Sequence, residues 1–422
     1  MKFGTDGIRG VFGKDITADA FRKVANSLRI IGAKRIVLGI DTRTSGATLA
    51  RAVCEGAIGA GMDVDFAGIT TTPMLSFITV NKGYDLGIML TASHNPKEYN
   101  GLKVFNSDGY KLSKEQEKSI EEEYEKPYYF SARTGETRNV DYADEYIEML
   151  KSAGVPLGNL KVVCDCADGA TSKYAERLFN ELGALYIGLS DQGNGENIND
   201  GSGALYPERC REIVLKSHAD IGFSFDGDGD RMIAVLSDGS IVDGDRALLA
   251  LVRYARRTSQ KISAVCSTVS VNSALQGYLK ELGVGLEITD VGDHNVTERI
   301  TKKGLRYGSE QSGHIIDAKY LPSGDGLLAA VNLAKIYLSM GWEAFEYVPT
   351  PQKNFDIVCK EKEKTYKDLL SYKTLDMLNA LPRIKKVVLR PSGTEPKVRV
   401  TLEGEPKVMD IAERIVRLLC EL

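Results

Sequence analysis

The sequence contains no apolar run that approaches the ~20 residues of a membrane-spanning helix. Its opening residues, MKFGTDGIRG, lack the apolar core of a secretory signal peptide. A strong basic excess is also missing, because the formal net charge of the 422 residues is −4. This charge argues against nucleic acid or a membrane as partner. We therefore expect a cytoplasmic protein whose affinity for any phosphate comes from local arginines and backbone amides.

A disulfide framework is not expected either. The seven cysteines are an odd number, scattered from Cys54 to Cys420. Cys164 and Cys166 form a C-x-C pair, which can indicate a metal or redox site. Because both stand in the apolar segment KVVCDCADG, we interpret them as small buried strand residues. A reducing compartment is consistent with this usage.

A pattern of strand, helix, glycine and strand recurs three times. The copies begin at the segments RIVLGIDTRTSG, LKVVCDCADGAT and ISAVCSTVSVN. The helix-like segments close on Gly61, Gly183 and Gly283, where a C-terminal cap with positive φ suits glycine. Any α/β protein alternates in this way, but here each copy also ends in a polar loop at the same place. Ligands of open α/β sheets bind beyond the carboxyl ends of strands, so three such loops could face one cleft.

From about Tyr347 onward the sequence differs from these copies and predicts a smaller α+β domain. We expect an α/β protein in which three similar βαβ-type domains with mixed sheets and this smaller domain surround one cleft. Their expected bounds are residues 1–132, 133–236, 237–346 and 347–422. The segments YEKPYY and EYVPTPQ have the composition of linkers.

The segment DGDGDR places Asp226, Asp228 and Asp230 at alternate positions. In an extended chain these side chains point to one side, and the intervening glycines let the backbone curl. Three carboxylates are a good site for Mg²⁺. An EF-hand is excluded, because Arg231 stands where that loop requires glycine and Ser237 where it requires glutamate. The alternative is an acidic surface turn, in which carboxylates this close would repel one another.

The segment LTASHNPKEYNGLKVF places Ser93 directly after the apolar run LGIML. Ser93 could belong to a polar turn that leaves a buried strand, or it could be a nucleophile that carries a covalent group. His94 could orient the hydroxyl, and Lys103 could face the same cleft from the next strand. Arg9, in GTDGIRG, and Arg43, in DTR, could meet a phosphate on Ser93.

Two further loops carry groups that suit a sugar phosphate. The segment RPSGTEPKVR offers hydroxyls, a glycine backbone and guanidinium groups to a phosphate, at Arg390, Ser392, Gly393, Thr394 and Arg399. Read alone, this segment leaves a surface loop with a capping serine as the less favoured alternative. In GSEQSGH, Glu310 and Ser312 are natural partners of sugar hydroxyls or an amine. His314 could act as a general acid or base, although a lone histidine is more often structural.

These groups together favour phosphoryl transfer. Hydrolysis by an activated serine would need a Ser/His/Asp grouping, and none is evident in the sequence. A phosphoserine would instead carry the negative charge that a metal on the three aspartates neutralises. A metal-dependent phosphomonoester hydrolase that uses the same serine and a non-catalytic sugar-phosphate sensor remain as alternatives.

The motifs TASHNP, DGDGDR, GSEQSGH and RPSGTEPKVRV, in this order, resemble those of the α-D-phosphohexomutases. The resemblance implies that Ser93 is phosphorylated and binds Mg²⁺ together with the three aspartates. It implies that Glu310 and Ser312 contact the sugar and that the RPSGTEPKVR residues bind its phosphate. By the same resemblance Lys103, a candidate proton carrier, lies near the phosphoserine with Arg9, Arg43 and His94.

Within that family, FGTDGIRG, NINDGSG, Gln311 and the Pro351-Gln352 pair resemble the branch that acts on glucosamine phosphates. This branch interconverts the 6- and 1-phosphates through a hexosamine 1,6-bisphosphate. The alternative is a branch that acts on mannose or glucose phosphates by the same mechanism. His294-Asn295 in VGDHNV, Ser309 and the threonine that begins TASHNP depart from the glucosamine branch, and all three bear on the substrate. We expect a small-molecule sugar phosphate as partner and a monomer or homodimer.

Overall fold

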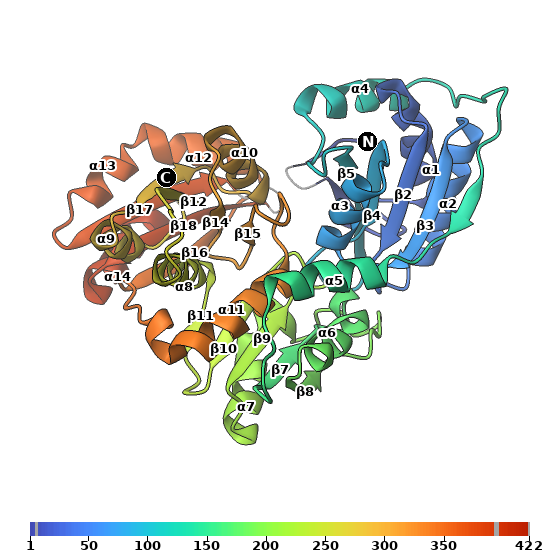
Figure 1. Cartoon of the computed structure of the whole chain (residues 1–422). Helices are drawn as coiled ribbons and strands as arrows, with labels where there is room; N and C mark the ends of the chain where they lie inside the picture. The colour runs from blue at the N-terminus through green and yellow to red at the C-terminus, as the bar shows by residue number, and fades with distance from the viewer. Residues whose placement is uncertain (5–6, 392–395, 421–422) are drawn as a thin grey trace.

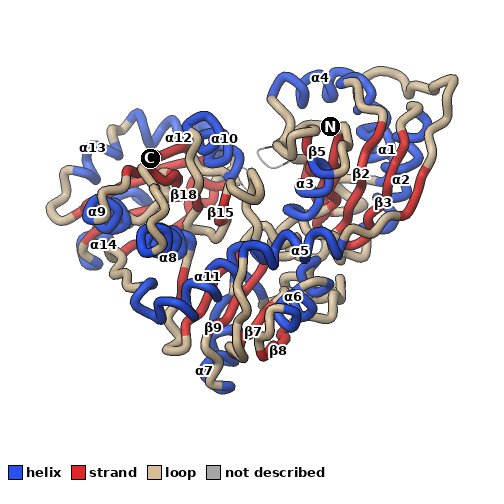
Figure 2. The backbone as a smooth tube through the Cα atoms, in the orientation of Figure 1, coloured by secondary structure: helices blue, strands red, loops and turns tan. Residues whose placement is uncertain are grey.

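The computed structural model describes residues 1–4, 7–391 and 396–420. Figure 1 shows the N-terminal sheet and its helices, in blue, on one arm of a V, and the C-terminal half of the chain on the other arm. Green elements from the middle of the chain join the two arms at the base. In Figure 2 helices pack around each group of strands. Among the described residues, no helix is both long and apolar enough to span a bilayer.

The first sheet has six strands in the order β1-β5-β4-β2-β3-β6. Its central strand, β4, is buried at every position, as its continuous apolar sequence LGIML requires. The strands and helices of this part of the chain are β1 (Ile8–Val11), α1 (Ala18–Ser27), β2 (Arg35–Ile40), α2 (Gly46–Gly59), β3 (Asp63–Ile69), α3 (Thr72–Asn81), β4 (Leu86–Leu90), β5 (Tyr99–Asn106), α4 (Lys114–Tyr124) and β6 (Thr137–Asn139).

The second sheet has the order β11-β10-β9-β7-β8, and the third has the order β13-β12-β14-β15. The second is formed by α5 (Ala143–Ala153), β7 (Lys161–Asp165), α6 (Ala175–Glu181), β8 (Leu185–Leu189), α7 (Pro207–Ser217), β9 (Ile221–Phe225), β10 (Met232–Leu236) and β11 (Ile241–Val242). The third is formed by α8 (Gly244–Arg257), β12 (Ala264–Thr268), α9 (Ser273–Glu281), β13 (Gly285–Thr289), α10 (Asp293–Lys303), β14 (Tyr307–Ser309), β15 (Ile315–Asp317) and α11 (Gly326–Met340).

The threefold repetition predicted from the sequence is confirmed. Each of these sheets contains the spatial order β5-β4-β2-β3, β10-β9-β7-β8 or β15-β14-β12-β13. In each order the last three strands are parallel to one another, and the first strand is antiparallel to its neighbour. Gly61, Gly183 and Gly283 have φ values of 87°, 81° and 66° and follow helix ends, as expected. The serine, metal and sugar loops follow β4, β9 and β14, so they occupy equivalent places in the three sheets.

The fourth sheet is antiparallel, in the order β16-β18-β17, and its apolar cluster is separate from those of the first three sheets. The predicted smaller α+β domain is therefore present. Its elements are β16 (Gln352–Val358), α12 (Lys362–Ser371), α13 (Thr374–Asn379), β17 (Ile384–Pro391), β18 (Lys397–Gly404) and α14 (Pro406–Leu419).

Two short edge strands lie just beyond the expected domain bounds. A boundary at residue 132 would remove β6, which pairs with β3 and completes the first sheet. A boundary at residue 236 would remove β11, which pairs with β10. Both are edge strands of two or three residues. So short a segment has no sequence pattern of its own, and only its pairing assigns it to a sheet.

Candidate active site

Ser93 has a backbone φ of 52°, in the left-handed region that residues other than glycine seldom adopt. Its N–H donates a hydrogen bond of 2.8 Å to Oγ1 of Thr91, and that hydroxyl donates one of 2.7 Å to Oδ2 of Asp41. Such a conformation persists only where the surrounding structure holds it. The strand end therefore presents the Ser93 hydroxyl in a fixed direction.

Arg43 supplies most of this support. Its buried guanidinium donates to the carbonyl oxygens of Ser93, at 2.9 Å, and of Asn95, at 2.7 Å, and pairs with Asp41 at 2.9 Å. From the sequence we expect Arg43 to contact a phosphate, either on Ser93 or on the substrate. In the structure this group instead hydrogen-bonds the backbone of the serine loop. From the loop that follows β8, Asn199 donates to the same two carbonyl oxygens, at 2.9 and 3.1 Å.

The metal loop meets the serine loop through direct contacts. The Ser93 hydroxyl donates a hydrogen bond of 2.7 Å to Oδ2 of Asp226. Gly227 makes this approach possible, because a Cβ there would lie 2.6 Å from the carbonyl oxygen of Ser93. The sequence predicted that these two loops face one cleft, and the structure places them in contact.

The three aspartates fit a divalent cation. Asp226, Asp228 and Asp230 are buried, and one carboxylate oxygen from each lies within 4.8 Å of the others. Oδ1 of Asp228 is buried and has no hydrogen-bond partner among the described residues. Burial and the charges of Asp230 and Asp228 raise the pKa of Asp226 to about 7. Mg²⁺ takes hard oxygen ligands such as carboxylates in proteins, so these three side chains suit it.

Lys103 provides a positive charge at this cluster. Its Nζ lies 2.7 Å from Oδ2 of Asp228 and 2.9 Å from Oδ2 of Asp230, and the side chain is buried. Although burial opposes it, the charges of Lys103 and His314 hold the pKa of Asp230 well below its usual range. The expectation that Lys103 faces the same cleft as Ser93 agrees with this position.

The two histidines of the site differ in charge. His314 lies between two carboxylates, with Nε2 3.1 Å from Asp230 and Nδ1 2.9 Å from Glu310. Burial lowers the pKa of His314, but the neighbouring Asp230 outweighs it and raises the pKa to about 10. His94 has Nδ1 3.2 Å from the Ser93 hydroxyl, and burial together with Arg231 and Arg9 lowers its pKa to about 2. Near neutral pH, His314 is therefore a cation and His94 is neutral.

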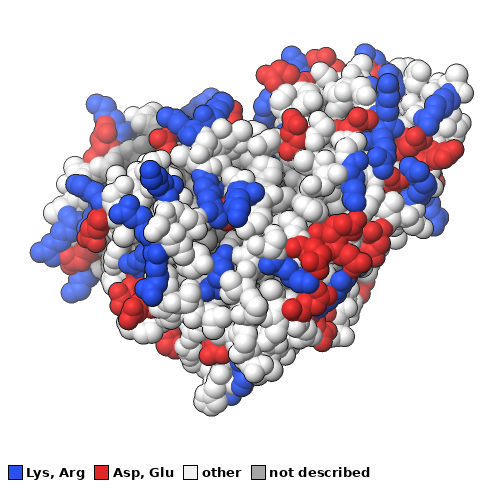
Figure 3. All heavy atoms as spheres, in the orientation of Figure 1, with Lys and Arg blue, Asp and Glu red and all other residues white. Residues whose placement is uncertain are grey.

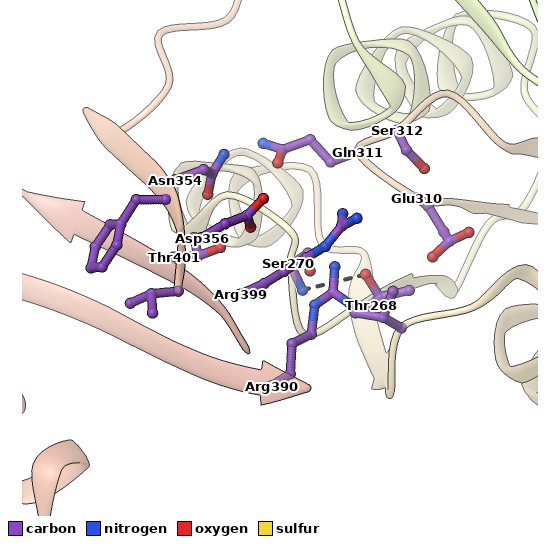
Figure 4. A pocket seen from close by; sticks show the side chains of 13 residues that line it. Thr268, Ser270, Glu310, Gln311, Ser312, Asn354, Asp356, Arg390, Arg399 and Thr401 are labelled. Atoms are coloured by element: carbon purple, nitrogen blue, oxygen red, sulfur yellow. Dashed lines mark hydrogen bonds between the residues drawn. The ribbon is translucent and has the colours of Figure 1, made fainter. Parts of the chain in front are cut away.

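All four sheets contribute to one cleft of about 710 Å³. Its polar lining includes Arg9, His94, Arg231, Glu310, Ser312, His314, Arg390 and Arg399. Arg390 and Arg399 face each other in the pairing of β17 with β18. An adjoining pocket of about 630 Å³ shares these arginines with the cleft. In Figure 4 both guanidinium groups lie on one side of this pocket, and Glu310 and Ser312 lie on the other side. Ser392, Gly393 and Thr394 of the predicted phosphate loop lie outside the described residues.

The positive charge of the cleft is local. Figure 3 shows basic and acidic side chains interspersed over the visible face, with acidic groups gathered over α5, which contains Asp144, Glu145 and Glu148. Burial and the neighbouring Arg399 lower the pKa of Arg390. Two guanidinium groups that oppose each other in this way favour an anion between them.

Sequence reasoning missed several residues of the site. Arg231 is the last residue of the DGDGDR motif, where the sequence indicated no role for it beyond excluding an EF-hand. In the structure its Nε lies 3.9 Å from both Asp226 and Asp230. Asn199 lies in NINDGSG, a segment that resembles one branch of the family but gives no sign of a contact with the serine loop. Thr72 gave no sequence signal, yet its N–H donates to the carbonyl oxygen of Asp228 at 2.9 Å.

Known proteins resemble this chain over its whole length. Four models of the phosphoglucomutase/phosphomannomutase family match it: alpha/beta/alpha domain I at residues 1–129, domain II at 141–239, domain III at 243–353 and the C-terminal domain at 356–418. Phosphoglucosamine mutase of Caldicellulosiruptor bescii is 38% identical over 96% of this chain and 94% of its own. Phosphoglucosamine mutase of Dictyoglomus thermophilum is 39% identical over 99% of this chain and 96% of its own.

A solved structure gives the same result. The crystal structure of a phosphoglucomutase/phosphomannomutase family protein from Burkholderia thailandensis superposes with a TM-score of 0.82 and 25% identity. The alignment covers 99% of this chain and 96% of that one. The resemblance identified from the motifs is thus confirmed over all four sheets. The chain, a phosphotransferring isomerase by its domains and its relatives, belongs to the phosphoglucomutase/phosphomannomutase family.

Proposed function

We propose that this protein is a phosphoglucosamine mutase that interconverts glucosamine 6-phosphate and glucosamine 1-phosphate. The observation that carries the proposal is the 2.7 Å contact between the Ser93 hydroxyl and Asp226. It lies beside His94 and Arg231, which line a cleft that also contains Arg390 and Arg399. Such a cleft offers a group that can carry phosphate and, separately, an anion site. The choice of glucosamine is supported by relatives named phosphoglucosamine mutase at 38 and 39% identity.

Ser93 is the phosphoryl carrier in this proposal. The P–O bond to Ser93 Oγ breaks while a new one forms to the free hydroxyl oxygen of the substrate, which yields a 1,6-bisphosphate. The proton of that hydroxyl passes to Ser93 Oγ, and Lys103 is the proposed carrier. After the bisphosphate turns end for end, Ser93 takes the other phosphoryl group. Arg9 and His94, which line the cleft near Ser93, bind the phosphoserine.

Asp226, Asp228 and Asp230, together with the phosphoserine, would hold Mg²⁺. When bound, this cation neutralises negative charge on the phosphoryl group. The chain itself places positive charge beside the metal ligands, because Lys103 and protonated His314 both lie next to the carboxylate of Asp230. We assign His314 the role of keeping Asp230 ionised and Glu310 oriented.

Glu310 and Ser312 bind the sugar, and Arg390 and Arg399 bind the phosphate that is not transferred, together with Ser392, Gly393 and Thr394. A guanidinium fork matches phosphate geometry with paired hydrogen bonds. The separate apolar cluster of the fourth sheet is consistent with a domain that moves to let the bisphosphate turn. We expect a cytoplasmic enzyme that is a monomer or homodimer and has a sugar phosphate as its small-molecule partner.

The test is a comparison of kcat/KM for glucosamine, glucose and mannose phosphates, each supplied with its own 1,6-bisphosphate. We expect the highest value for glucosamine phosphate. Equal or faster turnover of mannose 1-phosphate would assign the enzyme to the phosphomannomutases. Steady release of inorganic phosphate without a bisphosphate requirement would indicate a hydrolase.

A further inference from the structure

One ion pair joins the serine-bearing part of the chain to the sugar-binding part. Lys111 follows β5 and forms an isolated bridge with Phe105 on the first sheet. Its Nζ lies 2.8 Å from Oδ1 of Asp293, the first residue of α10 beside the third sheet. The side chains are only 14% and 17% exposed, so water screens this pair less than it screens a surface pair.

Asp293 is connected to the proposed sugar ligand through its neighbour. Gly292 precedes α10 with a φ of 127°, and its N–H donates a hydrogen bond of 2.9 Å to Oε1 of Glu310. Both Gly292 and Asp293 line the 710 Å³ cleft. The residue paired with Lys111 therefore directly follows the residue whose amide hydrogen-bonds Glu310.

A second contact lies farther along the same helix. The hydroxyl of Tyr110, next to Lys111, is 3.1 Å from Oγ1 of Thr301 on α10. Tyr110 and Thr301 also line a cavity of about 370 Å³ between the first and third sheets. The Tyr110–Thr301 contact therefore bridges the two facing surfaces at this cavity, and the Lys111–Asp293 pair bridges them next to it.

We propose that the Lys111–Asp293 pair is an interdomain strut that positions the sugar-binding loop relative to the serine loop. Lys111 and Asp293 act in this role as positioning residues, because they act on the substrate through Gly292 and Glu310. The strut keeps Glu310 at a constant distance from Ser93 while the fourth domain moves. This inference rests on the proposed function, since Glu310 is the proposed sugar ligand.

The test uses Lys111→Met, Asp293→Asn and the charge-reversed double variant K111D/D293K. Lys114→Met is the matched control, because Lys114 lies in the same part of the chain and pairs with Glu117, three residues along the same helix. We expect each single variant to raise KM for the sugar phosphate about fivefold with kcat changed less than about twofold. The double variant should recover most of the loss, and the control should behave as wild type.

Hydrogen exchange of the α10 amides provides a readout that needs no substrate. We expect faster exchange at residues 293–303 in Lys111→Met than in wild type or the control. Unchanged exchange, or a KM equal to that of the control, would overturn the strut. If α10 exchanges faster but wild type turns over no hexose phosphate, the strut stands and the proposed function fails.

Discussion

The hydroxyl of Ser93 donates a hydrogen bond of 2.7 Å to Asp226, which lies 133 positions farther along the chain. The contact joins the end of β4 to the end of β9, two strands that occupy equivalent places in different sheets. A covalent group on Ser93 would therefore lie directly beside the aspartate cluster.

Replacement of Ser93 with alanine should abolish mutase activity, by at least ~10³-fold, because no other hydroxyl replaces the phosphoryl carrier. Intact-mass measurement should show a fraction of wild type heavier by one phosphoryl group and no such fraction in Ser93→Ala. Ser119→Ala, on the exposed face of α4, is the control. Retention of mutase activity in Ser93→Ala would show that Ser93 is not the phosphoryl carrier. Sugar-phosphate binding that Ser93→Ala leaves intact, in a wild type that turns nothing over, would support the sensor alternative.

Removal of divalent cations with EDTA should stop turnover, and Mg²⁺ should restore it, because three buried carboxylates need a cation to accommodate an incoming phosphate. Asp228→Asn should raise the Mg²⁺ concentration for half-maximal activity at least ~10-fold. Asp238→Asn, in the turn between β10 and β11, should not change it. Full activity in EDTA would exclude a metal role for the aspartates.

Loss of the Asn199 amide should slow the phosphoryl transfer without weakening substrate binding. Asn199 has a φ of 60°, so Asn199→Gly removes its two hydrogen bonds to the serine loop without adding backbone strain. Each bond contributes about 1 kcal/mol, so we expect kcat to fall about 10-fold or more with little change in KM.

The control for this variant is Asn159→Gly. Asn159 has a φ of 68° and is exposed, away from the serine loop. Steady-state kinetics of both variants should separate the effect of the amide from that of a glycine in the left-handed region. Equal kinetics in the two variants would show that Asn199 does not position Ser93.

Replacement of Arg390 with lysine should raise KM for the sugar phosphate about 10- to 100-fold, because a lysine keeps the charge but loses the paired hydrogen bonds to phosphate. Phosphorylation of Ser93 should persist in this variant. Arg417→Lys, on α14 of the same domain and paired with Glu413, is the control. A wild-type KM in Arg390→Lys would remove Arg390 from the phosphate site.

Lys335, remote from the site on α11, should make stability depend on pH. Burial lowers its pKa to about 8, although Nζ donates to Asn332 at 2.8 Å. In the unfolded chain the pKa is about 10.4, so between about pH 8 and 10.4 the unfolded state binds more protons and the free energy of unfolding rises with pH. Below pH 8 the buried charge destabilises the fold.

Urea titrations of wild type and Lys335→Met at several pH values test this relation. The stability difference should shift in favour of wild type by roughly 2 kcal/mol from pH 7.5 to 10.5, a value discounted for the partial exposure of Lys335. Lys216→Met, at an exposed pair with Glu212, should show no such shift. A constant difference between wild type and Lys335→Met would contradict the lowered pKa.

The repeated strand–helix–strand order, the buried central strands and the loops that carry Ser93 and the three aspartates could all be predicted from the amino-acid sequence. These features depend on local periodicity and on residue types that a loop needs, and both are visible within a short window. The glycine caps at Gly61, Gly183 and Gly283 are predictable for the same reason, because the positive φ that ends a helix is a local requirement.

The charges and hydrogen bonds that distant side chains share could not be predicted in this way and became visible in the folded chain. Folding directed Arg43 into the serine loop, brought Asn199 onto the same carbonyls and placed His314 between Asp230 and Glu310. Such roles depend on which groups meet after separate sheets have packed together, and burial and neighbouring charges then set each pKa. No short stretch of sequence contains that information.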